Sequence, residues 1–261
     1  MQTWKLDIEY DGTAYRGWQM QRNARSVQGE LLNAAEAVFE QRVELSGAGR
    51  TDAGVHAIHQ VAHLRVRDSE EDFRPKQLQF ALNDRLPHNI NVKRIQNATN
   101  EFHARHDAVS RTYIYQISQR RTAFGKNYVW WIKDVLSPSL MSQAAESIIG
   151  KHNFRSFCEV EDEREPTIAV VRSAEVFVDG DVICFRVTAN HFLWKMVRRL
   201  VGTLAEIGRG KLSPNSMANF LLKPSAIPAK LTAPPSGLFL EKVCYPNDKP
   251  PTEQKAIFPI N

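Results

Sequence analysis

The strongest constraint on the fold is a strict alternation of apolar and charged residues close to the N-terminus. From Trp4 to Tyr10 every second residue is apolar, and Lys5, Asp7 and Glu9 occupy the positions between them. Successive side chains of a β-strand point to opposite faces of the sheet. The pattern therefore predicts a strand with one buried face and one solvated face.

A segment with helical periodicity follows this strand. Ser26 is a suitable N-cap, because its hydroxyl can accept a hydrogen bond from a backbone N–H of the first turn. Behind it, apolar residues recur at spacings of three and four, namely Leu31, Leu32, Ala35, Val38 and Phe39. We expect this helix to cover the apolar face of the sheet to which the first strand belongs.

The remainder of the first half repeats this mixture of strands and helices. Pro75 is well placed to start a second helix that runs through residues 77–82. The expected strands are 43–48, one that extends through Leu64 or Val66, and 89–95. Residues 98–107 are polar and lack periodicity, so we place a domain boundary there and assign residues 1–105 to an N-terminal α+β subdomain.

The second half, residues 106–261, is also expected to mix antiparallel strands with helices. Asp179, Gly180 and Asp181 form a turn signal between two apolar runs, which predicts a β-hairpin. The expected strands are 111–118, 170–178, 182–187 and 237–243, and the expected helices are 138–149 and 192–207, with a Pro-rich linker at 228–235. The fold class predicted for the whole chain is therefore α+β.

Composition narrows the function only slightly. The 34 Lys and Arg residues exceed the 29 Asp and Glu residues, which gives a net charge of +5 and a mild preference for polyanions. The three cysteines are widely spaced and suggest buried thiols in a reducing compartment rather than a disulfide framework. No apolar run is long enough to span a bilayer. We therefore expect a cytoplasmic protein with no membrane role.

The segment from Gly49 to Ala57 is the most informative for chemistry. Glycines at 49 and 54 flank Asp52, so the chain can bend between two strands and expose a carboxylate. A nucleotide could press against such a turn. The alternative is an ordinary tight turn that carries a surface aspartate.

These nine residues resemble the signature of the tRNA pseudouridine synthase A family, in which this motif carries the catalytic aspartate. The resemblance extends along almost the whole chain. It includes Tyr10-Asp11-Gly12-Thr13, Gly17-Trp18-Gln19, Val27-Gln28-Gly29-Glu30, Asn83 with Leu86-Pro87, Phe102-His103-Ala104-Arg105, Arg111 with Tyr113, Phe154 with Phe157, Met196-Val197-Arg198 and Gly237-Leu238.

The resemblance implies a pseudouridine synthase fold. Two similar RNA-recognition-like or ferredoxin-like halves would form one extended antiparallel sheet flanked by helices, with a basic cleft and a homodimer as the working unit. It further implies that Asp52 attacks the target uridine, whose uracil detaches at N1, turns and rejoins through C5, without a cofactor. Attack at the sugar and attack at the base both remain open. The implied substrate is the anticodon stem-loop of tRNA, at positions 38–40.

Three residues of the second half match motif positions of the family. Arg198 would be the cation paired with Asp52, Tyr113 would stack on the flipped uracil, and Leu238 would form an apolar wall on the far side of the base. Each has an ordinary alternative. Arg198 could grip a phosphate, Tyr113 could be a core residue, and Leu238 could simply pack within its strand.

Further basic residues are candidates for contacts with RNA. Arg50 lies two residues before Asp52 and could fill the place of an extruded base, since a planar guanidinium can stack in the gap; a structural ion pair is the alternative. Arg105 and Arg111 flank the junction between the halves and could contact phosphates. The alternative is that these arginines simply lie on solvated faces of the protein.

Other functions remain to be separated from this one. His56, His59 and His63 could suggest a zinc site, but no nearby Cys or Glu completes a tetrahedral set, so no metal is expected. A noncatalytic RNA-binding or RNA-folding protein would carry the same basic clusters. An aspartate-nucleophile hydrolase would need a metal site and further acidic ligands, which the motif lacks.

Overall fold

The computed structural model describes residues 1–67, 73–160, 162 and 164–260. The chain divides into two compact units. Unit 1 comprises Met1–Val109 and Phe239–Lys249, and unit 2 comprises Ser110–Leu238 and Pro250–Asn261. The segment 239–249, which follows the whole second half in the sequence, therefore packs with unit 1.

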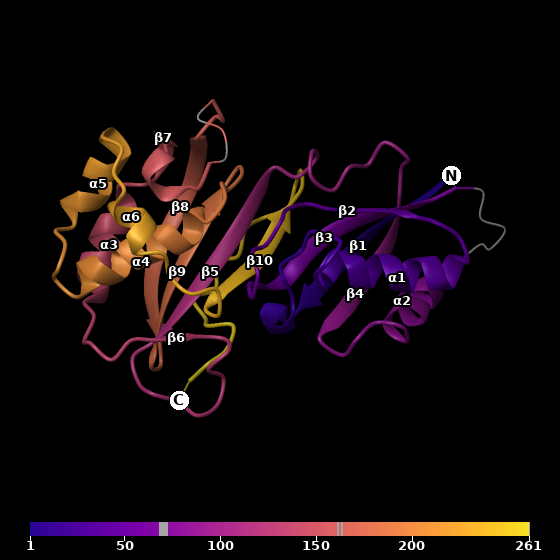
Figure 1. Cartoon of the computed structure of the whole chain (residues 1–261), viewed down its shortest axis with the longest axis horizontal. Coiled ribbons are helices and arrows are strands. Elements are labelled where there is room, and N and C mark those ends of the chain that lie inside the picture. The colour runs from indigo at the N-terminus through magenta and orange to yellow at the C-terminus, as the bar shows by residue number, and fades with distance from the viewer. Residues whose placement is uncertain (68–72, 161, 163, 261) are drawn as a thin grey trace. The chain divides into compact units, whose positions relative to one another are not determined.

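Unit 1 is a sheet covered by helices (Figure 1). Its strands follow the order β4-β1-β3-β10, with β2 paired to β3. The pairs β1–β3, β1–β4 and β2–β3 are antiparallel, whereas β10 runs parallel to β3. Its elements are β1 (Gln2–Tyr10), η1 (Gly12–Ala14), α1 (Val27–Phe39), β2 (Glu44–Gly47), β3 (His56–Val66), α2 (Pro75–Asn83), β4 (Ile90–Ala98) and β10 (Leu238–Cys244).

The alternating N-terminal segment is confirmed as a half-buried strand. Every apolar residue from Trp4 to Tyr10 on that face is buried. Ser26 caps α1 through a hydrogen bond that its side chain accepts from Gly29 N, and the ring centroids of Trp4 and Phe39 lie 5.5 Å apart. Helix α1 therefore covers the apolar face of β1, as predicted.

Unit 2 repeats the combination with a second set of antiparallel strands (Figure 1). The order is β5-β9-β8-β7, and the two-residue β6 pairs parallel to β5. Helix α3 packs against β8 and α4. The elements are β5 (Ser110–Ser118), β6 (Trp130–Trp131), α3 (Pro138–Glu146), β7 (Gly150–Asn153), η2 (Arg155–Phe157), β8 (Ile168–Asp179), β9 (Val182–Ala189), α4 (Met196–Gly208), α5 (Asn215–Leu222) and α6 (Ile227–Lys230).

The predicted helix at 192–207 starts too early. Helix α4 begins at Met196, because Lys195 adopts a left-handed conformation with φ 61°. The carbonyl of Trp194 accepts a hydrogen bond from Glu159 N at 3.0 Å, outside any helical ladder. Tertiary contacts thus override an apolar pattern that would otherwise extend the helix by one turn.

Several short elements escaped the sequence analysis. The predicted helix at 138–149 ends at Glu146, and the linker at 228–235 contains most of the four-residue helix α6. Strands β6 and β7 and helix α5 were not predicted, because elements of two to eight residues carry too few repeats to show a period. The predicted α+β class is confirmed: the sheets are mostly antiparallel and helices flank them.

Candidate active site

Asp52 lies on the bend between β2 and β3, in unit 1. Its side chain is half-buried, and its carbonyl accepts a hydrogen bond from Val55 N at 3.1 Å, which closes a tight turn. The preceding Thr51 is buried, and its carbonyl accepts from Trp18 N at 3.0 Å. The backbone of the loop is therefore fixed on both sides of the aspartate.

The chain that holds this loop is the segment from Gly12 to Trp18. A Cβ added to Gly12 would lie 2.0 Å from the carbonyl oxygen of Val55, and one added to Gly17 would lie 2.5 Å from that of Thr51. Gly17 also has φ +97°, in the left-handed region that favours glycine. Only residues without side chains allow the two loops to approach so closely.

The two glycines of the motif differ in their roles. Gly54 has φ 75° and donates its N–H to Tyr15 O at 3.2 Å, so the turn requires it. Gly49 has no positive φ, and an added Cβ would meet no atom within 4 Å. Its carbonyl accepts from Gln60 Nε2 at 2.9 Å. The fold thus explains Gly54 but leaves open space at Gly49.

The side chain of Tyr10 contacts the Asp52 loop at Thr51. The sequence did not identify Tyr10 as a site residue. Its hydroxyl lies 2.7 Å from Thr51 Oγ1 within the buried interior. Burial raises the pKa of the Tyr10 phenol, while its hydrogen bond to Thr51 acts in the opposite direction. A neutral hydroxyl therefore holds the residue next to Asp52. The motif match at Tyr10 was the only sequence signal for this contact.

The predicted RNA-contacting arginines of unit 1 are both exposed. Arg50 precedes the buried Thr51 on the loop itself. Arg105 lies in a turn between β4 and β5, and its N–H donates to His103 Nδ1 at 3.2 Å. Arg50 therefore shares the bend with Asp52, whereas Arg105 belongs to a separate turn.

In unit 2, Arg198 projects from the first turn of α4. Its Nε donates to the carbonyl of Ala233 at 2.7 Å, and Ala233 N donates back to the Arg198 carbonyl at 3.0 Å. The hydroxyl of Tyr115 donates to Pro234 O at 2.8 Å. Burial raises the pKa of Tyr115 well above its usual value, and the positive charge of Arg198 opposes this shift. Arg198 and Tyr115 thus share one backbone segment, although only Arg198 was singled out beforehand.

Close packing of α4 explains how this segment is held. A Cβ added to Gly202 would lie 1.5 Å from the carbonyl oxygen of Leu231. The helix can therefore approach residues 231–233 only because position 202 lacks a side chain. The predicted linker is consequently a packed part of the unit that orients Arg198.

The other predicted residues of unit 2 are buried. Tyr113 on β5 is 8% exposed and makes an edge-to-face contact with Phe192, with ring centroids 4.9 Å apart. Arg111, on the same strand, donates from Nη1 to Asn190 O at 3.0 Å. Leu238 is the first residue of β10, and its N–H donates to Pro235 O at 2.9 Å.

The three histidines of β3 have separate partners. His56 Nδ1 accepts from Gly12 N at 3.1 Å, His59 Nδ1 accepts from Val243 N at 3.4 Å, and His63 Nδ1 accepts from Ala104 N at 3.1 Å. Within the described parts of the chain, no group of three or more His, Cys, Asp or Glu residues is arranged to hold a metal ion. The imidazoles connect β3 to other backbone segments of unit 1.

In residues 1–67, 73–160, 162 and 164–260, no helix is both long and apolar enough to cross a bilayer.

A carboxylate on a backbone-pinned loop is a suitable arrangement for a catalytic nucleophile, because its position is fixed before substrate binds. A family model described as "tRNA pseudouridine synthase" matches residues 8–107 and 144–246. These ranges include the Asp52 loop and the Arg198 helix. The chain therefore belongs to the tRNA pseudouridine synthase family.

Individual relatives agree with this assignment. The protein named tRNA pseudouridine synthase A from Rhodopseudomonas palustris (strain BisA53) is 40% identical over 94% of this chain and 100% of its own length. The proteins of the same name from Brachyspira hyodysenteriae and Dictyoglomus turgidum are each 36% identical over 94% of this chain, covering 98% and 100% of their own lengths. A solved structure titled "Crystal Structure of a Cbf5-Nop10-Gar1 Complex" covers 78% of this chain and 54% of that one at 10% identity, with a TM-score of 0.31 that is too low to support an argument.

Proposed function

We propose that this chain isomerises uridine to pseudouridine in tRNA, with Asp52 as the nucleophile. Membership of the family supports uridine isomerisation in tRNA as the reaction. The observation that carries the choice of Asp52 is the loop geometry. Thr51 and Val55 are held by backbone hydrogen bonds and by the close approach of Gly12 and Gly17, while the aspartate between them remains half-exposed.

The reaction exchanges one bond of the nucleoside for another. The bond between N1 of uracil and C1′ of the ribose breaks, the base turns, and a bond between C5 and C1′ forms. C5 loses its proton and N1 gains one, so the product is an isomer of the substrate. An ionised Asp52 would act as the nucleophile in either route, whether it adds to the sugar or to the base.

The other residues of the proposal hold the substrate. Arg198 would be the cation that pairs with the Asp52 carboxylate, since a positive charge stabilises a negative one. Tyr113 would stack on the uracil, and Leu238 would close the opposite side of the base. Arg50 would fill the position of the flipped nucleotide. The hydrogen bond that Arg198 Nε donates to the Ala233 carbonyl supports the role of that side chain, because it restricts where the guanidinium can lie.

The proposed targets are positions 38–40 of the anticodon stem-loop, with Arg105 and Arg111 near the phosphates. A homodimer is proposed as the working form and the cytoplasm as its location. Light scattering tests the dimer directly: a species of twice the chain mass is expected, and a monomer at micromolar concentration would contradict it. Transcripts with cytidine at positions 38, 39 or 40 test the target, because each should lose only the pseudouridine of the replaced position.

Tritium release from tRNA labelled at C5 of uracil tests the reaction. Wild-type protein should release tritium into water, because C5 loses its hydrogen when it bonds to C1′. Asp52→Asn keeps the size of the side chain but removes the nucleophile, and should abolish release while tRNA binding persists. The matched control is Asp84→Asn, which removes an exposed aspartate at the end of α2 and should leave release unchanged.

The competing function is a noncatalytic RNA-binding or RNA-folding protein. It predicts that neither wild type nor Asp52→Asn releases tritium, although both bind tRNA. If folded Asp52→Asn released tritium at the wild-type rate, the proposed role of Asp52 as nucleophile would be refuted. The isomerase function itself would stand.

A further inference from the structure

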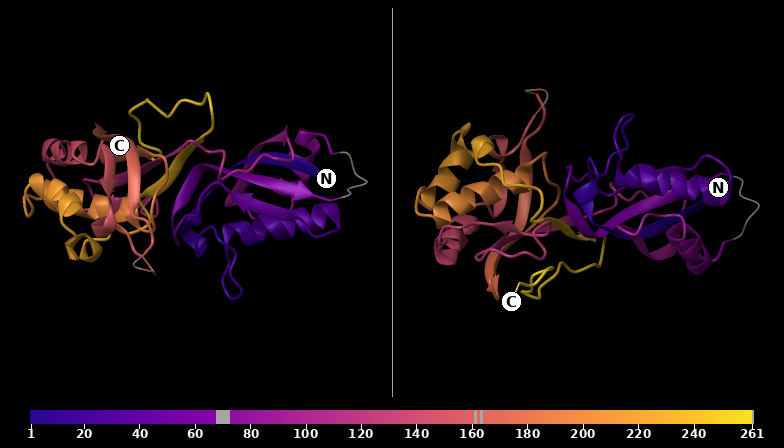
Figure 2. Two further views of the ribbon diagram at one scale, coloured as in Figure 1. Left: turned by 90° about the horizontal axis from the view of Figure 1, so that it is seen from above. Right: turned by 60° about the horizontal axis from the view of Figure 1, so that its bottom comes forward.

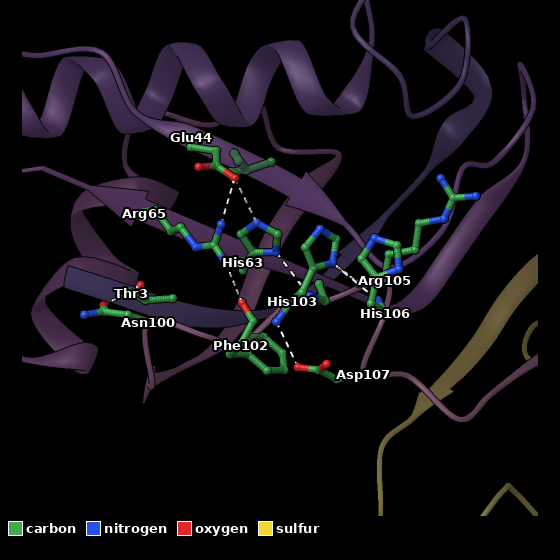
Figure 3. Close-up of polar contacts among 12 residues, drawn as sticks. Thr3, Glu44, His63, Arg65, Asn100, Phe102, His103, Arg105, His106 and Asp107 are labelled. Carbon is green, nitrogen blue, oxygen red and sulfur yellow. Dashed lines mark hydrogen bonds and ion pairs between the residues drawn. The ribbon is translucent and has the colours of Figure 1, made fainter. Parts of the chain in front are cut away.

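In the turn that carries Arg105, five successive backbone N–H groups each donate a hydrogen bond. From His103 to Asp107 each amide has an acceptor, and two of the acceptors are imidazole nitrogens (Figure 3). His103 N donates to Asp107 Oδ2 at 2.9 Å, Ala104 N to His63 Nδ1 at 3.1 Å, Arg105 N and His106 N to His103 Nδ1 at 3.2 and 3.3 Å, and Asp107 N to His103 O at 3.1 Å.

His63 is the only one of these acceptors that comes from outside the turn. It lies on β3 directly opposite Lys5 of β1, so it points to the sheet face opposite the one that α1 covers. The His63 side chain is fully buried. Its remaining nitrogen, Nε2, lies 3.3 Å from Glu44 Oε1. One imidazole therefore links the sheet to the turn.

Arg65 forms a second link between the sheet and the residue before the turn. Arg65 Nη1 donates to the same Glu44 oxygen at 3.1 Å, and Arg65 Nη2 donates to Phe102 O at 2.9 Å. Within the part of the chain that the structure describes, the charged or titratable groups around His63 are Glu44, Arg65, Lys5 and His103. On the other side of the turn, Tyr245 donates its hydroxyl to Ala104 O at 2.7 Å.

The turn presents its basic side chains outward. Arg105 and His106 are exposed, and Figure 3 shows the Arg105 side chain extending away from His63 and Glu44. An exposed arginine on a backbone held at every amide loses less conformational freedom when it binds a phosphate than one on a free loop. The fixed backbone is therefore an advantage for an RNA contact.

We propose that His63 is a positioning residue for tRNA binding: by accepting the Ala104 N–H, it fixes the turn that presents Arg105 to the RNA backbone. The proposal rests on the proposed function, since it requires that Arg105 contact tRNA. His63 itself touches no substrate. The geometry requires the lone pair of Nδ1, so the imidazole acts in its neutral form, with its proton on Nε2 toward Glu44.

Two substitutions separate the acceptor from the rest of the side chain. His63→Asn retains an oxygen at the place of Nδ1, whereas His63→Leu fills similar space without an acceptor. Removing the acceptor leaves the buried Ala104 N–H unsatisfied, so the turn is held less firmly. His63→Leu should therefore raise the KM for tRNA by roughly three- to tenfold and leave kcat within about twofold. His63→Asn should restore the wild-type KM, and His88→Asn, at an exposed histidine, is the control.

A double-mutant cycle with Arg105→Ala tests whether His63 acts through that residue. If it does, Arg105→Ala raises KM, and adding His63→Leu to it raises KM no further. The proposal is overturned if the two effects multiply, if Arg105→Ala has no effect, or if folded His63→Asn behaves like His63→Leu. Should wild type release no tritium, the proposed function fails. The same variants are then compared by their Kd for tRNA, and the same outcomes decide the inference.

A pH series decides the matter if His63→Leu does not fold. Burial lowers the pKa of His63 below its usual value, and the hydrogen bond to Glu44 opposes this. A proton on Nδ1 removes the acceptor in wild type, whereas the asparagine side chain introduced by His63→Asn cannot titrate. The ratio of wild-type KM to that of His63→Asn should stay near one at neutral pH and rise as the pH falls through the lowered pKa of His63. Histidines remote from His63 titrate alike in both proteins and cancel in this ratio. A ratio that stays flat down to the lowest pH at which both proteins are folded overturns the proposal.

Discussion

The position of Asp52 depends on two glycines, which have no side chains. Gly12 and Gly17 allow two loops to contact each other through their backbones, and the carbonyls of Thr51 and Val55 occupy the space that a side chain would need. The sequence shows a glycine-rich N-terminal motif but not what lies against it. At this scale the motif 10–19 is the support on which the Asp52 loop rests.

Gly17→Ala should therefore damage the site. The new methyl group would lie 2.5 Å from Thr51 O, at a residue with φ +97°. Left-handed strain together with a backbone clash should cost at least about 2 kcal/mol of unfolding free energy. Urea unfolding followed by circular dichroism measures the loss, and tritium release should fall with it.

Gly49→Ala is the matched control on the Asp52 loop. Its φ is not positive and its Cβ would meet no atom within 4 Å, so stability should stay within about 1 kcal/mol of wild type. A weaker affinity of this variant for tRNA would indicate that a nucleotide approaches the open space. Equal destabilisation by the two substitutions would refute the account of Gly17.

Histidines make the stability of unit 1 depend on pH. Burial lowers the pKa values of His59, His63 and His103 below the usual value. The unfolded chain thus binds protons at a higher pH than the folded chain does. Stability should be complete above about pH 6.5 and fall as the pH drops from there through the lower folded pKa values. Urea unfolding between pH 8 and pH 5 measures this, and His63→Asn should flatten the curve.

At the scale of elements, the C-terminal tail forms hydrogen bonds with several strands of unit 2 although its described residues contain no regular helix or strand. Residues 250–260 belong to unit 2 and form an irregular segment beside it (Figure 2). The buried Gln116 accepts from Phe258 N at 3.0 Å and from Ile257 N, Asp179 accepts from Ala256 N at 2.8 Å, and Arg186 donates to Glu253 O at 2.8 Å. Side chains of β5, β8 and β9 thus find their partners in the tail.

Deletion of residues 250–261 should destabilise unit 2. It leaves the buried Gln116 acceptor unsatisfied and removes the Phe258 ring, which packs beside Gly125 and lies 5.2 Å from the ring of Tyr128. A loss of about 2 kcal/mol would lower the melting temperature by roughly 4–8 °C. Hydrogen exchange should accelerate in β5 and β9.

Lys255→Ala is the control for this deletion. Lys255 lies in the same tail, and its Nζ pairs with Glu253 at 2.5 Å where both side chains are exposed. The melting temperature should therefore be unchanged. If the deletion also left the melting temperature unchanged, the hydrogen bonds of the tail would contribute nothing measurable to stability.

Predictability from sequence varied among elements for physical reasons. The strand at 4–10 and the helix after Ser26 were predictable because their apolar periods are long and their cap is local. The start of α4 was not, because the left-handed Lys195 is held by Glu159, a residue far away in the sequence, through its ion pair at 2.5 Å. Short elements such as β6 carry no period at all.

At the scale of the whole molecule, a segment from the end of the sequence packs with the unit formed by its beginning. Residues 239–249 return to unit 1, where β10 pairs with β3 at Phe239–His56 and Leu240–Ala57. The domain division expected from the sequence includes this strand in the second half, residues 106–261. The parallel pairing joins segments more than 180 residues apart, and no local pattern encodes such a partner.

The α+β class, the main strands and helices, and the family could all be predicted from the sequence, because periodicity, caps and the motif around Asp52 are properties of contiguous residues. The contacts that hold that motif in place became visible only in the folded protein. The contact of Gly17 with Thr51, the bond from Ala104 to His63 and the bonds from the tail to Gln116 all join residues distant in sequence. These contacts depend on how distant backbone segments pack against each other. A pattern of neighbouring residues cannot predict which segments those are.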